Sequence, residues 1–181
     1  MTTIELTTEE MLFASKIGYY RTIENEQRPD IADYDQKRFR LTSLQANRLG
    51  VMCEMAAGKA LGLDMLHTTM DQWVSWIPSE HYGMYPKPDI LQRYEVRRCE
   101  KMSNPIPIRL KDVEHEAIVL QIHVEYIKND DEIIVPSRAT IVGWCDAKEE
   151  WATADKPAWS RSNKSRVVTE KRPFSELIVN V

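Results

Sequence analysis

The chain is poor in the residues that build zinc knuckles, disulfide frameworks and phosphate loops. It has three cysteines in 181 residues and no Cys-x-x-Cys pair, so neither a zinc knuckle nor a disulfide framework is indicated. This cysteine usage favours a reducing compartment such as the cytosol. With six glycines, the chain also lacks a glycine-rich phosphate loop, a Gly-x-Ser-x-Gly motif and a dinucleotide-binding fingerprint. These absences leave nucleotide-dependent, serine-hydrolase and NAD-dependent activities without support.

Long hydrophobic runs and a large excess of charge of one sign are absent as well. No apolar run approaches the roughly 18 residues that a membrane span requires. The N-terminus lacks the basic and apolar regions of a signal peptide. We therefore expect a cytoplasmic protein that makes no membrane contact. A formal net charge of −4 excludes a uniformly basic nucleic-acid coat protein, and 43% hydrophobic residues in this length fit one ordinary domain with a buried core.

Hydrophobic patterning predicts helices first, then strands, then a short helix. The clearest helix covers 43–61, with Ser43 as its N-cap and Gly62 as its C-terminal stop. Further helices are expected at 8–23 and 146–152, and strands at 73–77, 91–98, 117–127 and 138–144. This order predicts an α/β (α+β) fold, a single small domain with a central mixed β-sheet flanked by helices. Its parts are an N-terminal helical segment (1–42), a core (43–145) and a C-terminal helix with a basic tail packed on the core (146–181).

Charge is distributed unevenly along the chain. Residues 87–111 carry seven basic and three acidic side chains, residues 156–172 carry six basic and one acidic, and residues 112–150 carry ten acidic and three basic. Basic stretches in an acidic chain can form a phosphate-binding face, although solvated loops with scattered charge have the same composition. The side chains predicted to contact a nucleic-acid backbone are Arg93, Arg98, Lys101, Arg161 and Arg166.

Three acids and one arginine form a candidate catalytic group. Glu54 lies on the predicted helix 43–61, on a face where an acid needs an explanation because the helix is otherwise largely apolar. Asp89 follows Pro88 and precedes a strand in which Glu95 and Arg97 are two residues apart and therefore share a face. Carboxylates are preferred ligands of Mg²⁺ (or Mn²⁺), and a fixed cation can stabilise charge that develops on a phosphate. We therefore predict metal-dependent phosphodiester hydrolysis. In this prediction the metal ligands are Glu54, Asp89 and Glu95, and Arg97 stabilises charge on the phosphate.

This arrangement resembles the PD-(D/E)XK nuclease superfamily, whose core has an acid-bearing helix, a Pro-Asp and an (Asp/Glu)-x-Lys strand end. The matching residues are Glu54 on the helix, Asp89 after Pro88, Glu95, and Arg97 at the lysine position. More closely, the chain is similar to predicted nuclease-like proteins of phage genomes, through VMCEMAAGKALG, the strand reading EVR and the later pair Gly143-Trp144. The resemblance covers roughly residues 43–145. It implies a restriction-endonuclease-like core, a Mg²⁺-dependent activity on DNA and a location in the host cytoplasm.

Arg97 departs from the pattern of the superfamily, which usually has lysine at this position. A lysine can orient or deprotonate the attacking water, whereas arginine stays protonated and cannot act as a base. A second metal ion, Lys101 or Gln121 could take over that role. The alternative is a catalytically inactive nuclease-fold protein of phage origin that binds DNA or a host protein. A third interpretation is a structural homo-oligomer, for which the tryptophans could supply interface anchors.

Overall fold

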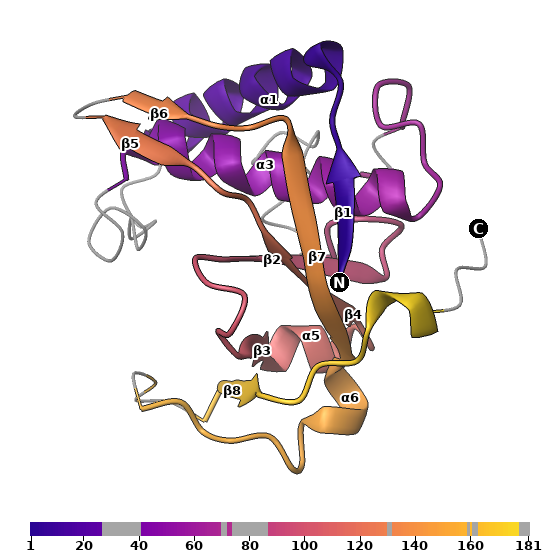
Figure 1. The fold of residues 1–181 in the computed structure, drawn as a ribbon. Helices are drawn as coiled ribbons and strands as arrows, with labels where there is room; N and C mark the ends of the chain where they lie inside the picture. The colour runs from indigo at the N-terminus through magenta and orange to yellow at the C-terminus, as the bar shows by residue number, and fades with distance from the viewer. Residues whose placement is uncertain are drawn as a thin grey trace.

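The structure, a computed structural model, describes residues 1–26, 41–69, 72–73, 87–129, 132–158, 160 and 163–177. In these ranges the chain has the predicted α+β class, with two long helices over a mixed four-stranded sheet (Figure 1). The strand predicted at 73–77 lies outside the described residues except for Trp73, whose backbone forms an isolated bridge with Ile90. No helix in this described part combines the length and the apolar character needed to cross a membrane.

The central sheet has the strand order β1-β7-β4-β2. Its strands are β1 Thr2–Glu5, β7 Arg138–Asp146, β4 Ile118–His123 and β2 Tyr94–Cys99. Strand β7 runs antiparallel to both of its neighbours, whereas β2 is parallel to β4 and stands at the end of the order. A parallel pair needs a crossover connection, and the chain between β2 and β4 supplies it. This crossover matters for the site because it contains a short helix that returns to β2.

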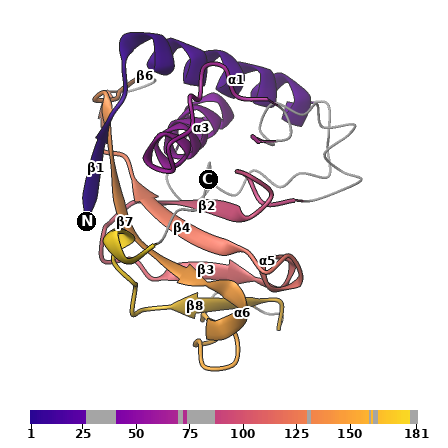
Figure 2. The same cartoon turned by 90° about the vertical axis from the view of Figure 1, so that its right-hand side faces the viewer.

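Two helices cover one face of the sheet (Figure 2). They are α1 Thr8–Glu26 and α3 Ser43–Ala60. As its composition predicted, α3 is buried around most of its circumference, and it lies between α1 and the sheet in the main hydrophobic core. Helix α1 is the outer layer of this side of the molecule (Figure 2).

Local sequence explains where α3 begins and how closely α1 approaches it. The N-cap is Thr42 rather than the predicted Ser43, because the Thr42 hydroxyl accepts from the backbone N–H of Gln45 and the Gln45 side chain accepts from the backbone N–H of Thr42. Gly18, on α1, lies against the backbone of α3. A Cβ there would lie 2.8 Å from Arg48 Cα and 2.9 Å from Arg48 N, so only glycine lets the two backbones meet.

Smaller elements cover the opposite face of the sheet (Figure 2). They are β3 Ile106–Arg109, α5 Leu110–Glu114, α6 Ala147–Glu150 and β8 Ser165–Val168, with β3 and β8 paired antiparallel. The predicted Asp146 cap of α6 is present, and its carboxylate accepts from two backbone N–H groups. A second apolar cluster on this side includes Val119 of β4. Strand β4 is therefore buried on both faces, including Gln121, which its alternating pattern placed on a polar face.

Two strands are shorter than their sequence patterns predicted. The run 117–127 is not one strand: β4 ends at His123, and the chain continues into a hairpin of β5 Ile127–Asn129 and β6 Glu132–Ile134. Strand β2 begins at Tyr94 instead of residue 91. Leu91 and Gln92 have φ angles of 51° and 53°, in the left-handed region that an extended strand cannot contain, and they form a turn.

The C-terminal segment crosses β7 at the Gly143-Trp144 pair. The backbones of Trp144 and Arg172 exchange two hydrogen bonds of 3.0 Å, and the Trp144 indole N–H donates to the carbonyl of Pro173 at 3.0 Å. A Cβ at Gly143 would lie 2.7 Å from Lys171 Cβ and 2.9 Å from the carbonyl oxygen of Arg172. The glycine is therefore needed for this close approach. The described chain then continues into the 3-10 helix η2, Phe174–Glu176.

Candidate active site

Asp89 is held against strand β2 by the turn that precedes the strand. The turn reverses the chain so that Ile90 forms a bridge with Tyr94, and the backbone N–H of Val96 donates to Asp89 Oδ2 at 2.7 Å. The carboxyl group is buried, with 8% of the residue exposed. Within the described ranges, no cationic side chain forms an ion pair with it. Asp89 is therefore a buried acid that lacks a counter-ion in this part of the chain.

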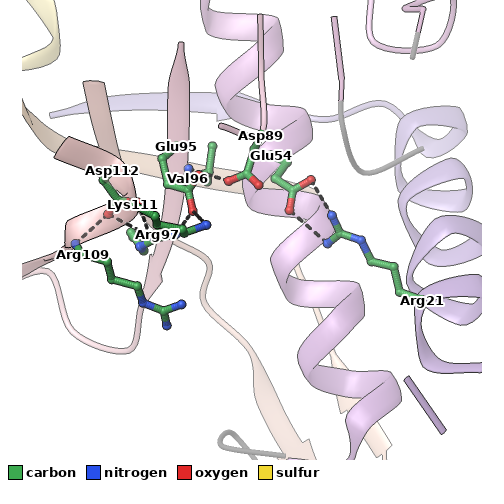
Figure 3. A network of polar contacts seen from close by, with 9 residues as sticks. All are labelled: Arg21, Glu54, Asp89, Glu95, Val96, Arg97, Arg109, Lys111 and Asp112. Carbon is green, nitrogen blue, oxygen red and sulfur yellow. Dashed lines mark hydrogen bonds and ion pairs between the residues drawn. The ribbon is translucent and has the colours of Figure 1, made fainter. Parts of the chain in front are cut away.

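Alternation along β2 sends neighbouring side chains to opposite faces of the sheet. Tyr94 and Val96 pack in the main core with α3, whereas Glu95 and Arg97 point to the side of α5. The prediction that Glu95 and Arg97 share a face is confirmed by their direct ion pair. Glu54 belongs to α3, so it approaches β2 from the opposite side, and Asp89 lies between the two glutamates (Figure 3). The three predicted acids are thus arranged around one strand rather than on one face.

Glu54 joins the two long helices through an ion pair. Both terminal nitrogens of Arg21, on α1, donate to its two oxygens at 3.0 Å each, and the Trp73 indole N–H donates to Oε2 at 2.8 Å. The carboxylate is buried. Gly50, one turn earlier on α3, lies beside the guanidinium, and a Cβ there would be in ordinary van der Waals contact with Arg21 Nη1 at 4.0 Å. These contacts explain why an otherwise apolar helix carries an acid at this position.

A chain of ion pairs connects β2 to α5 (Figure 3). Arg97 Nη1 donates to Glu95 Oε1, and Arg97 Nη2 donates to both oxygens of Asp112 at 3.1 and 3.0 Å. Lys111 Nζ donates to the same oxygen of Glu95 at 3.0 Å. Burial by itself raises the pKa of Glu95, but the positive charges of Arg97 and Lys111 outweigh burial and hold that pKa below its usual value. Glu95 is therefore an ionised, tightly held carboxylate.

The pKa of Asp89 is shifted in the opposite direction. Burial raises it well above its ordinary value, and the negative charges of Glu95 and Glu54 raise it further. The backbone N–H of Val96 and the more distant Arg97 lower it, but by less. Both glutamates are close enough to raise the pKa of Asp89, so the fold brings the three predicted acids into one neighbourhood. In the described ranges, the ion pairs of this neighbourhood join three carboxylates, Glu54, Glu95 and Asp112, with three cations, Arg21, Arg97 and Lys111, and Asp89 belongs to none of them.

Asp89 and Glu95 have carboxylate oxygens that could bind a hard divalent cation. No group of three or more His, Cys, Asp or Glu side chains in the described ranges is arranged to hold a metal ion. Mg²⁺, however, commonly takes only one or two carboxylates and completes its shell with waters and substrate phosphates. Asp89 has no counter-ion in the described ranges, and both cations on Glu95 bond Oε1, which leaves Oε2 without a hydrogen bond there. Glu54 differs, because Arg21 and Trp73 already occupy both of its oxygens.

The side chains predicted to contact nucleic acid are spread over two strands. Arg93 and Lys101 are exposed and lie before and after β2. Arg98 is mostly buried, with 9% of its side chain exposed, and forms an ion pair with Glu100. Arg166 lies on β8, and its guanidinium is 5.0 Å from the centroid of the Trp151 ring. Arg161 lies outside the described residues.

Sequence reasoning missed Arg21, Lys111 and Asp112. Lys111 and Asp112 stand where the basic stretch 87–111 meets the acidic stretch 112–150, but nothing in that pattern indicates that α5 folds back onto β2. Of the residues proposed to replace the missing lysine, Gln121 is the register partner of Arg97, is fully buried and donates to the carbonyl of Pro105 at 3.0 Å. Lys101 lies beyond the far end of β2. The lysine beside Glu95 is instead Lys111.

Comparisons of this chain with family models, with curated proteins and with solved structures found no match.

Proposed function

We propose that this chain is a nuclease-like protein that binds a divalent cation at Asp89 and Glu95 and hydrolyses phosphodiester bonds in nucleic acid, with DNA as the expected substrate. One observation carries the proposal: Asp89 is buried beside two other acids and has no counter-ion in the described ranges. An unpaired buried charge is costly. A divalent cation would offset that cost, and the motifs that resemble PD-(D/E)XK nucleases predict a cation at these same residues.

The residues of the chain would bind and orient the reactants. When bound, Mg²⁺ or Mn²⁺ supplies a Lewis acid for the phosphate and an activated water. Arg97 stays protonated at any working pH and cannot accept a proton from that water. Both of its terminal nitrogens are bonded to carboxylates, so its part is to hold Glu95 in place. The three cysteines are free and buried, which fits a reducing compartment, and we place the protein in the cytoplasm.

The proposal is tested by metal titration and by cleavage. We expect wild-type protein to bind Mg²⁺ or Mn²⁺ in isothermal titration and to cut DNA, whereas Asp89→Ala and Glu95→Ala lose both properties and keep the wild-type circular dichroism spectrum. Asp64→Asn is the control, because Asp64 is an exposed acid bonded to His67. It should bind and cut like wild type. Wild-type cleavage rates in the Asp89 and Glu95 variants would contradict the proposal.

A second candidate is a nuclease fold that has lost catalysis and binds DNA or a protein partner. Its support is the set of ion pairs: Arg97 stands at the lysine position and is bonded to two carboxylates, and Glu54 is fully bonded to Arg21 and Trp73. In that case, wild-type protein binds its partner equally well in EDTA and in Mg²⁺. Neither Mg²⁺ nor Mn²⁺ then changes its melting temperature, and no DNA or RNA is cut.

A further inference from the structure

The three cations beside the predicted acids differ in how many of their hydrogen-bond donors are already used. They are Arg21, Arg97 and Lys111. Both terminal nitrogens of Arg21 donate hydrogen bonds to Glu54. Those of Arg97 donate to Glu95 and Asp112. The Nε of Arg97 is buried and has no hydrogen-bond partner in the described structure. Within the described ranges, the ammonium of Lys111 makes one hydrogen bond, to Glu95, although an ammonium has three donors. Its side chain is also the most exposed of the three, at 30%, compared with 14% for Arg97.

The short helix α5 is fixed so that Lys111 stays beside Glu95. Asp112 accepts from the backbone N–H of Arg109 at 2.8 Å and from the guanidinium of Arg97, which ties the first turn of α5 to β2. The backbone N–H of Leu110 donates to the carbonyl of Lys164 at 3.0 Å, next to β8. Lys111 stands between these two anchored residues. The backbone of Lys111 is therefore held beside Glu95, while the end of its side chain remains partly open to solvent.

We propose that Lys111 is the phosphate-contacting cation of this site, and that Arg97 and Asp112 are positioning residues that hold Glu95 and α5. The ligand is a phosphodiester of a nucleic-acid backbone, which would be bonded by the two ammonium donors that Glu95 leaves unused. This inference rests on the proposed function, because it needs nucleic acid at the Asp89–Glu95 site. It differs from the sequence prediction, in which Arg97 contacts the phosphate.

The test uses the salt dependence of binding to a fluorescein-labelled DNA duplex, measured by fluorescence anisotropy in EDTA, together with cleavage rates in Mg²⁺. Each phosphate contact contributes about 0.9 to the slope of log K against log salt concentration. Lys111→Met should lower that slope by about one and reduce kcat/KM by about 100-fold, as expected for loss of one charge-stabilising donor. Lys111→Arg keeps the charge and should keep the slope.

Lys148→Met is the matched control, because Lys148 is a surface lysine that also forms an ion pair with a glutamate, Glu116. It should leave both slope and cleavage unchanged. A wild-type slope and rate in Lys111→Met, in a protein whose wild type binds or cuts DNA, would overturn this inference and leave the proposed function standing. A wild type that neither binds nor cuts any nucleic acid would overturn both. Circular dichroism of each variant verifies that the fold is retained.

Discussion

Replacing Asp89 by asparagine should stabilise the protein and abolish its response to divalent cations. Asparagine has nearly the same shape, and its side-chain oxygen can still accept from the backbone N–H of Val96, which bonds Asp89 at 2.7 Å. The substitution removes a buried negative charge that Glu95 and Glu54 repel. Stability and function are therefore expected to change in opposite directions, as they do where a site is kept strained for binding.

The sign of the stability change follows from the direction of the Asp89 pKa shift. In the unfolded chain Asp89 titrates near its ordinary pKa of about 3.9, whereas in the folded chain its pKa is raised by burial and by the neighbouring acids. The folded state thus binds more protons between these two pKa values, and the free energy of unfolding falls as the pH rises through that interval. At pH values above the folded pKa, each pKa unit of upward shift lowers the free energy of unfolding by about 1.4 kcal/mol. Asp89→Asn removes this cost, so it should melt above wild type once the pH exceeds the folded pKa, by about 2–4 °C for each kcal/mol gained in a domain of this size.

The assay is thermal unfolding in EDTA at a series of pH values, repeated with Mn²⁺. The difference between Asp89→Asn and wild type should be small near pH 4 and should grow as the pH rises. Mn²⁺ should raise the melting temperature of wild type and leave that of the variant unchanged. Asp64→Asn, at an exposed position, should follow wild type in both buffers. A variant that is less stable than wild type at every pH, by a constant amount, would refute the reasoning.

Three further outcomes follow from the packing. Arg97→Met leaves Glu95 and Asp112 with less positive charge in a buried setting, so it should lower the free energy of unfolding by about 3–5 kcal/mol in urea denaturation. An unchanged urea midpoint would show that this network is not structural. Gly18→Ala places a Cβ 2.8 Å from the backbone of Arg48 and should cost about 1–3 kcal/mol, although alanine is the better helix former. A rise in melting temperature would contradict that close approach. The three cysteines are buried and burial raises the pKa of each thiol, so none should react with a thiol reagent until the protein is denatured.

Local sequence determined the elements that depend on near neighbours. The helix at 43–60 follows from apolar residues around most of its circumference and a capping residue at its start, and α6 follows from the Asp146 cap. The spacing of Glu95 and Arg97 by two residues on a strand was enough to place them on one face, where they form an ion pair. The turn at Leu91 and Gln92 was not predictable in the same way, because neither residue is typical of the left-handed region.

The surroundings of each acid were decided only by the tertiary structure. Glu54 is bonded to Arg21, 33 residues away, and Arg97 to Asp112, 15 residues away across a strand, a turn and a short helix. No periodicity or spacing encodes such pairs, because they depend on how α1 lies on α3 and how the crossover returns to β2. The sequence could therefore name three of the acids but not the partners of each. Only the fold decided that Asp89 is left without a counter-ion in the described ranges, and that Lys111 stands beside Glu95, because burial and charge depend on what packs against each carboxylate.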